Sequence, residues 1–528
     1  MEFDFIVVGA GSAGCALAHR LSADPGNRVA LLEAGPRKHF LSQVPISFAN
    51  LIDEPSANWC YRSEPEPGTS ERAIPVPRGR LLGGSSSING MVYVRGQQLD
   101  FDTWAQLGNR GWSYADVLPV FKRMEDYIDG GEDRGQGGPL RIGLVQDENP
   151  LYDALLAAGL EMGLPDNPDY NGAEQEGIVR TQATIHKGRR QSTAYAYLDP
   201  IRDRKNLTVL TGAEVNRVLL NGKQCTGVET LHEGRVKALS ATREVILCGG
   251  AINSPKILEL SGIGQPELLA EHGIEVQHAL PGVGESLRDH VSPRMVFRVE
   301  RPDAAYSAQG NGFGLVRSIL RYAVQRRGLL SLPTAPVIGF IRTRPELATP
   351  DVQYHFVPYR VVLHNGKRGM GRDPAITITV NQCRPESLGS IHIKSGNPRE
   401  NPAIRFNFLD AELDRRTLID GMRFIRKLLT TQAMAGICGE EMQPGPQVES
   451  DEDLLQFMRD KAETVYHPVG TCKMGNDPRA VVDHELKVHG IANLRVADGS
   501  IMPTLTSGNT NAPCIMIGEK CADMVLAA

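Results

Sequence analysis

The chain has 528 residues, of which 41% are hydrophobic and 23% are charged, and its formal net charge is −5. Because a single hydrophobic core stops growing at about 250 to 300 residues, we expect two joined domains. The balanced charge argues against nucleic acid as a partner, and no apolar run approaches the roughly 18 residues that a transmembrane helix needs. The nine cysteines include no Cys-x-x-Cys pair, so neither a disulfide framework nor a metal site is predicted.

The first thirty-three residues combine a strand, a glycine turn and a helix. Residues 4–8 are a short apolar strand that lacks the basic region and cleavage site of a secretory signal, so we expect a cytoplasmic location. Gly-Ala-Gly-Ser-Ala-Gly at 9–14 then opens an amphipathic helix, and a second strand at 29–32 ends in Glu33. This order predicts a dinucleotide-binding site.

Each part of this pattern has a physical role in binding a dinucleotide. Gly9 permits the tight turn, Gly11 lets the backbone approach the pyrophosphate, and Gly14 lets the helix pack closely on the strand. The N-terminus of the helix offers oriented N–H groups to the phosphates. Glu33 would accept hydrogen bonds from the ribose hydroxyls and disfavours NADP, whose 2′-phosphate it would repel. The pattern alone does not separate FAD from NAD.

Further along the chain, loops alternate with regular elements. Residues 64–68 and 130–139 are rich in proline and glycine, and the first of these loops is either a lid over the active site or a plain surface loop. Residues 375–380 and 390–394 alternate apolar and polar side chains, which predicts strands of an antiparallel sheet. The spacing within 412–429 predicts a helix with one buried face.

Several glycine-rich passages carry a family resemblance. Residues 79–90 read Gly-Arg-Leu-Leu-Gly-Gly-Ser-Ser-Ser-Ile-Asn-Gly, too polar for a core strand and suited to close approach of the backbone to a ligand. With them, the chain resembles the glucose-methanol-choline (GMC) oxidoreductases, in the choline dehydrogenase-like branch. The other passages that carry the resemblance are residues 250–255, 261–264, 466–475, 494–500 and 509–513.

The resemblance implies FAD rather than NAD, and an α/β fold in which a Rossmann-like FAD-binding domain joins an antiparallel-sheet substrate domain. The matched passages assign residues 1–150, 190–293 and 462–528 to the FAD-binding domain. Residues 151–189 and 294–461 then form the substrate-binding domain.

The family's FAD contacts can be transferred to this sequence one residue at a time. Some choline oxidases bond the flavin covalently through a histidine whose place is taken here by Ile88, so we expect noncovalent FAD. The residues that the resemblance and the glycine turn assign to FAD are Gly9, Gly11, Ser12, Ala13, Gly14, Glu33, Ala34, Arg80, Gly84, Asn89, Gly90, Met91, Val92, Val215, Asp498 and Gly499.

The same resemblance places the catalytic pair at His467 and Asn511. A histidine suits the task of a general base because its unperturbed pKa of about 6.5 is close to operating pH. Asn511 is expected to hold the substrate oxygen with a fixed dipole. For Asp289 and His290, where the sequence departs from the family pattern, structural roles are expected.

These assignments predict oxidation of a primary alcohol to the aldehyde, with hydride transfer to flavin N5. Choline-specific relatives are thought to place a glutamate where this chain has Pro336, so an uncharged aliphatic or aromatic alcohol is favoured over choline. The electron acceptor is either O₂ or a quinone-type molecule, and a homo-oligomer is compatible with the sequence. Lyase, photodecarboxylase and noncatalytic members of the fold remain alternatives.

Overall fold

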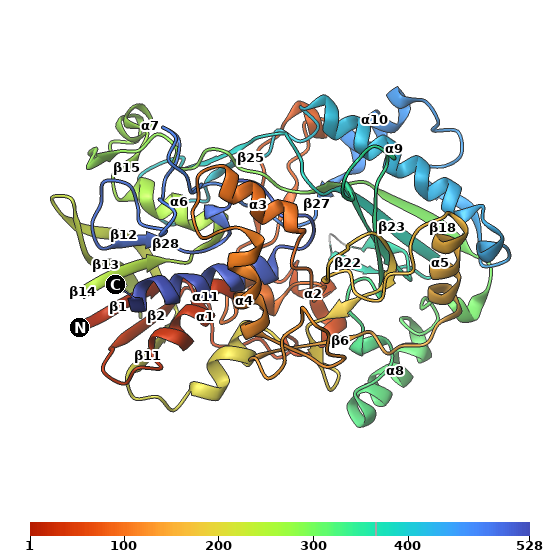
Figure 1. Cartoon of the computed structure of the whole chain (residues 1–528), viewed down its shortest axis with the longest axis horizontal. Helices are drawn as coiled ribbons and strands as arrows, with labels where there is room; N and C mark the ends of the chain where they lie inside the picture. The colour runs from red at the N-terminus through yellow and green to blue at the C-terminus, as the bar shows by residue number, and fades with distance from the viewer. Residues whose placement is uncertain (365–366, 528) are drawn as a thin grey trace.

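Two β-sheets form the frame of the molecule (Figure 1). The computed structural model describes residues 1–364 and 367–527. Five strands of the larger sheet are parallel, and an antiparallel meander extends one side of it. The strand order is β11 (Leu207–Thr211), β2 (Val29–Glu33), β1 (Glu2–Val8), β14 (Arg235–Leu247), β13 (Gln224–His232) and β12 (Ala213–Asn221), with β28 (Leu494–Val496) also paired to β14.

The larger sheet is covered by the first and last helices of the described chain. The apolar residues of β1 and β2 are buried on both faces, as expected for parallel strands between helical layers. Helices α1 (Ser12–Leu21) and α11 (Asn511–Ala527) pack against each other along this sheet (Figure 1). Segments from the two ends of the sequence therefore build one Rossmann-like unit, which confirms the predicted fold class.

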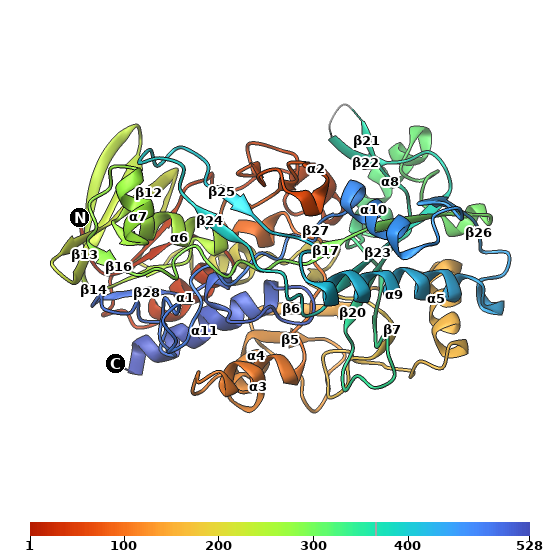
Figure 2. The same ribbon diagram turned by 90° about the horizontal axis from the view of Figure 1, so that it is seen from above.

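The smaller sheet is wholly antiparallel, as predicted. Its strand order is β26 (Cys438–Gln443), β18 (Arg294–Val299), β23 (Ala375–Gln382), β20 (Val352–Val357), β19 (Val337–Ile341) and β7 (Gly177–Arg180). Helix α9 (Glu412–Leu429) has the predicted bounds and buries Leu418, Met422 and Ile425 against this sheet (Figure 2). The strands of the two sheets fall within the two predicted sets of residue ranges, while the domain boundaries themselves stay a prediction.

Residues 390–394 follow the prediction in part. Here β24 (Ser390–His392) pairs only with β25 (Ala403–Arg405), outside the six-stranded sheet. The reason is the side chain of His392, which hydrogen-bonds the carboxylates of Glu259 and Glu285 and holds the strand against α6 (Gly250–Leu260).

The loop at 64–68 lies apart from the large cavity described below, because none of its residues lines that cavity. Glu66 accepts hydrogen bonds from the backbone N–H groups of Phe406 and Asn407, at 3.0 and 2.9 Å. These contacts favour a fixed surface loop over a lid. Within the described residues, no helix is long and apolar enough to cross a membrane.

Candidate active site

One large cavity joins the two halves of the molecule. It has a volume of about 940 Å³, close to the upper end of the range of about 300 to 1,000 Å³ that is typical of ligand sites. All the residues predicted to bind FAD line it except Gly14 and Arg80, and so do both predicted catalytic residues. Arg80 lies behind the wall, 4.8 Å from the ring of Trp59, which does line the cavity.

The glycine turn between β1 and α1 forms one wall. A Cβ on Gly14 would lie 1.9 Å from the carbonyl oxygen of Gly9, so this position tolerates no side chain where the helix meets the turn. A Cβ on Gly11 would meet no protein atom within 4 Å, because it would point into the cavity. This is the geometry expected of a turn that admits a pyrophosphate to the N-terminus of a helix.

Glu33 closes the same wall at the end of β2. Its side chain is buried and accepts hydrogen bonds from the N–H groups of Ala10 and Gly35, at 3.2 and 2.9 Å. Burial raises the pKa of Glu33 to about 7, although these two N–H groups lower it. The carboxyl therefore lines the cavity at the end of β2, where burial favours its neutral form more than water would.

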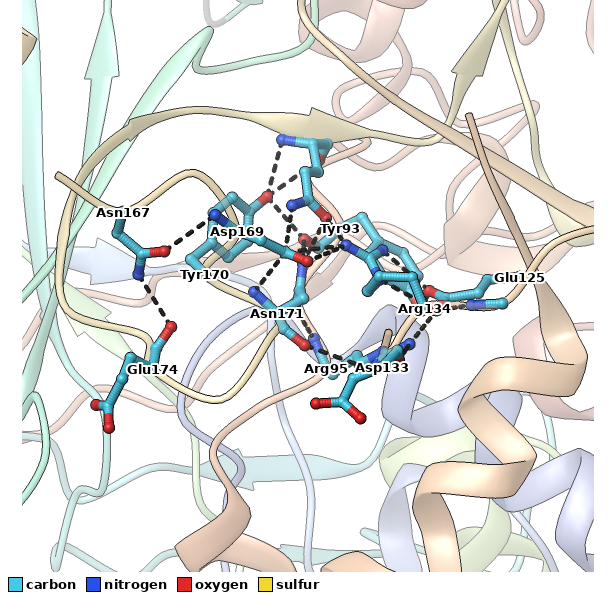
Figure 3. A network of polar contacts seen from close by, with 12 residues as sticks. Tyr93, Arg95, Glu125, Asp133, Arg134, Asn167, Asp169, Tyr170, Asn171 and Glu174 are labelled. Atoms are coloured by element: carbon cyan, nitrogen blue, oxygen red, sulfur yellow. Dashed lines mark hydrogen bonds and ion pairs between the residues drawn. The ribbon is translucent and has the colours of Figure 1, made fainter. Parts of the chain in front are cut away.

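A buried ionic network supports the cavity segment 89–92 (Figure 3). Arg95 and Arg134 both donate to the carboxylate of Glu125, and all three side chains are buried. The hydroxyl of Tyr93, the residue after this segment, donates to Glu125 over 3.0 Å. Because a buried charge is costly without partners, this network has one well-paired arrangement and holds the segment in place.

His467 lies at the end of a chain of hydrogen bonds that defines its tautomer. His290 contacts the carbonyl oxygen of Cys383 through Nε2 at 3.0 Å, and a carbonyl can only accept, so His290 Nε2 carries the hydrogen. In the neutral ring His290 Nδ1 then accepts from His467 Nδ1, 2.9 Å away. The remaining nitrogen, His467 Nε2, is left with a lone pair.

The surroundings of His467 keep it neutral. Burial lowers the pKa of His467 well below the usual histidine value, and the neighbouring His290 and His355 lower it further. Asp289 holds the backbone in place, because its Oδ1 accepts the N–H groups of both His290 and His467 at 2.8 Å. A neutral imidazole offers a lone pair that can accept a proton, while the lowered pKa makes this ring a weaker base than a free histidine.

Asn509, rather than Asn511, contacts this base. Its Nδ2 lies 3.1 Å from His467 Nε2, and its Oδ1 accepts from Gln353 of β20 at 3.0 Å, which fixes the orientation of the amide. Asn511 begins α11, and its Oδ1 accepts from the hydroxyl of Ser12 on α1 at 2.7 Å. The side chain of Asn511, which was predicted to hold the substrate oxygen, is therefore used in the contact between α1 and α11.

Sequence reasoning therefore missed Asn509, and it gave His290 only a structural role. The sequence did contain a signal for Asn509, since both asparagines fall in the passage 509–513. The resemblance to the family, however, selects one position in this passage and does not show which of two nearby asparagines contacts His467. Their separation depends on where α11 begins, which is set by tertiary packing.

Side chains of the smaller sheet form the opposite wall of the cavity. They come from three strands and include Arg294 of β18, His355 and Val357 of β20, and Thr377 and Thr379 of β23. This wall turns side chains toward the cavity, whereas the glycine turn exposes mainly backbone atoms to it.

A partly buried ionic cluster of three residues sets the charge of this second wall. Glu463 accepts from Arg294 at 2.7 Å and from Arg368 at 3.0 Å, and all three residues line the cavity. Burial alone would raise the pKa of Glu463, but the two guanidinium groups outweigh it and hold the pKa below its usual value. The other carboxylates among the described lining residues lie on the side of the glycine turn, and they are Glu33, Glu214 and Asp498. The described part of the second wall therefore has no unpaired carboxylate.

The fold and cavity together define a two-sheet protein with a glycine-turn wall of the kind that binds dinucleotides and a buried histidine in the cavity lining. Family models of the GMC oxidoreductases match residues 3–292 with their N-terminal part and residues 385–518 with their C-terminal part. The chain belongs to this family.

Curated relatives are similar over the whole chain. Mitochondrial choline dehydrogenase of Mus musculus is 41% identical, over 99% of this chain and 89% of the relative. Oxygen-dependent choline dehydrogenase of Brucella ovis is 42% identical, over 100% of this chain and 96% of the relative. These similarities do not support the predicted preference for an uncharged alcohol over choline.

Solved structures share the fold along its full length. Pyridoxine 4-oxidase from Mesorbium loti superposes with a TM-score of 0.90 at 32% identity, covering 100% of this chain and 99% of that chain. A formate oxidase from Aspergillus oryzae, determined to study modification of its FAD, has a TM-score of 0.92 at 28% identity, covering 100% and 98%.

Proposed function

We propose that this chain is an FAD-dependent enzyme that oxidises a primary alcohol to the aldehyde, with His467 as general base. The observation that carries the proposal is the hydrogen-bond chain through His290, which leaves the lone pair of a neutral His467 as a proton acceptor in the cavity wall. Membership of an oxidoreductase family supports the reaction class.

FAD is proposed to bind noncovalently along the glycine-turn wall, between Glu33 and the segment 89–92. Bound there, FAD supplies the acceptor for the hydride that leaves the carbinol carbon. Ile88 lines the cavity at the place where a covalent link would form, and its side chain has no nucleophilic atom. Acid precipitation should release all the flavin into solution; flavin retained in the precipitate would contradict noncovalent binding.

His467 and Asn509 act on the same substrate oxygen in this proposal. The alcohol O–H donates to His467 Nε2, and its oxygen accepts from Asn509 Nδ2, so the alcohol replaces the direct contact of 3.1 Å between the two side chains. His467 then takes the proton while the fixed amide dipole stabilises negative charge that develops on the oxygen. This assignment moves the role predicted for Asn511 to Asn509.

The proposed substrate class rests on the charges of the second wall. Arg294 and Arg368 leave Glu463 no charge to offer a quaternary ammonium group, which supports an uncharged primary alcohol. Choline is the second candidate, because the choline dehydrogenases are similar relatives and because aromatic rings, which attract cations, line the cavity. The aromatic residues are Phe48, Trp59, Tyr322, Tyr359 and Tyr466.

A matched pair of alcohols separates the two candidates. Choline and 3,3-dimethylbutan-1-ol have nearly the same shape and differ in charge. Anaerobic mixing with each, followed by flavin absorbance, should give faster reduction by the uncharged compound. Faster reduction by choline would identify the second candidate. Admission of air with peroxide detection then tells O₂ from a quinone-type acceptor.

The change of His467 to alanine tests the base. We expect His467→Ala to retain FAD and to slow anaerobic flavin reduction by about 10² or more, because a positioned base contributes about 10² to 10⁴. The measurement is stopped-flow absorbance under single-turnover conditions. Reduction at a near-normal rate in a variant that retains FAD would overturn the assignment.

Asn509 and Asn511 form a matched pair of variants. Asn509→Ala should slow flavin reduction by roughly 10- to 100-fold, as expected for the loss of one hydrogen-bond donor to developing charge. Asn511→Ala should lose mainly the contact to Ser12 and reduce the rate less than threefold, a small effect on the scale of oxyanion contacts. The opposite order of effects would restore Asn511 as the oxygen anchor.

A further inference from the structure

Helix α8 (Gly312–Gln325) exposes its apolar side chains to a degree found nowhere else in the described chain. Its only buried residues are Ser318 and Tyr322. Phe313 is 84% exposed and Val324 is 83% exposed. The other large exposed apolar residues on this helix are Leu315, Val316, Ile319 and Leu320. A surface helix normally turns its apolar face to the core, so this helix lacks its covering partner.

The charged side chains of α8 and of the two residues after it are all positive. The stretch 312–327 contains four arginines and no acidic residue. The four are Arg317, Arg321, Arg326 and Arg327. Arg321 lies near enough to Asp147 to oppose the rise in the pKa of that carboxyl, and Arg326 lies over the ring of Tyr322 at 4.9 Å. A helix that combines exposed bulky apolar side chains with arginines is typical of segments that lie in a lipid-water interface.

The same helix borders the catalytic cavity. Leu315, Ile319 and Tyr322 line the cavity that His467 also lines. In both views α8 projects from the body of the molecule at the end away from the two termini (Figures 1 and 2). A surface that covers α8 would therefore lie beside the cavity.

We propose that α8 seats this protein on an anionic lipid surface. The apolar side chains enter the region between headgroups and acyl chains, and the arginines meet the lipid phosphates. A second copy of this chain is a poorer partner, because a symmetric contact would bring two sets of four arginines together. Docking of this kind would give apolar alcohols, or a lipid-soluble electron acceptor, a short path to the cavity.

The test uses the full FAD-loaded chain and does not depend on its activity. Sedimentation with vesicles of phosphatidylcholine, or of phosphatidylcholine with phosphatidylglycerol, measures binding. We expect binding to the anionic vesicles that weakens as salt is raised. Arg317→Gln with Arg321→Gln should reduce the partition coefficient by about 30-fold, from about 1 kcal/mol per arginine.

The apolar contribution is tested separately. Phe313→Ser with Val324→Ser should reduce the partition coefficient by about tenfold or more, because binding scales with the apolar area that is buried. Leu160→Ser with Val236→Ser changes side chains that are 52% and 63% exposed on other elements, so it serves as the control and should not alter binding.

Two results would overturn the proposal. One is vesicle binding that is equal for both α8 variants, the control and the unchanged chain. The other is a chain that does not bind vesicles and that light scattering shows to be a dimer. If Phe313→Ser with Val324→Ser then converted the dimer to a monomer, α8 would be the contact between two copies of the chain.

Discussion

The two walls of the cavity are built by different means. The nucleotide side consists of backbone at the ends of β1 and β2, where short-range sequence order decides the geometry. The substrate side consists of side chains from strands that are distant in sequence, such as Arg294 and Thr379. A wall made of backbone tolerates change poorly and is easy to recognise in a sequence, whereas a wall made of side chains can alter its substrate without disturbing the cofactor.

The largest expected effect is on the backbone wall. Gly14→Ala places a Cβ within 1.9 Å of the Gly9 carbonyl oxygen, which must push α1 away from the turn. We expect a loss of about 3 kcal/mol in the free energy of unfolding, the upper range for overpacking. The protein should be isolated without flavin. Urea unfolding of the apoprotein and FAD titration measure the two effects.

Gly11→Ala is the matched control for this wall. Its backbone φ of −82° suits alanine, and the added Cβ would meet only the cavity. The unfolding free energy of the apoprotein should change by less than about 0.5 kcal/mol. FAD affinity should fall by about tenfold or more, because the methyl group occupies the approach of the pyrophosphate. Unchanged FAD affinity would contradict the view that FAD approaches the backbone of the glycine turn.

Glu463→Gln sharpens the comparison from the substrate side. It removes the carboxylate charge that two guanidinium groups share in a partly buried cluster, so we expect the unfolding free energy to fall by about 1 to 2 kcal/mol. FAD affinity should stay within about twofold, since Glu463 belongs to the other wall. The exposed pair Glu485–Lys487 provides the control, and Glu485→Gln should cost less than about 0.5 kcal/mol.

The smallest expected effect is the pH dependence of FAD binding. The pKa of Glu33 is raised by burial from 4.5 to about 7, so the apoprotein takes up a proton at this site as pH falls through 7. Its stability should therefore increase from pH 7 toward 4.5, as the buried charge is removed. Ribose hydroxyls favour the ionised form, so FAD affinity should fall by roughly tenfold from pH 8 to pH 6.

Glu33→Gln tests whether Glu33 causes the predicted pH dependence of FAD affinity. The variant has no proton to gain at this position, so its FAD dissociation constant should be flat between pH 6 and pH 8. A variant that keeps the full pH dependence would assign the titration to another group.

Local patterns predicted much of the fold and one wall of the site. The glycine turn, Glu33 and the bounds of α9 all depend on residues close in sequence, and they were predicted as such. Residues 390–392 form an antiparallel strand as predicted, but the alternating pattern did not reveal that this strand pairs only with β25 and that His392 contacts α6.

The catalytic partner and the exposed helix depend on tertiary packing. Asn509 and Asn511 make different contacts because α11 begins at Asn511 and brings that side chain to Ser12. Periodicity can indicate that 312–325 forms an amphipathic helix, but it does not say whether the rest of the chain covers the apolar face.

The pairing of β28 with β14 and of α11 with α1 has a consequence for biosynthesis. A ribosome delivers the glycine turn early, but it delivers β28 and α11 after every other element of the two sheets. His467 and Asn509 also emerge late. The nascent polypeptide thus carries an unfinished nucleotide site throughout most of translation, and flavin loading becomes a step that follows chain synthesis and does not accompany it.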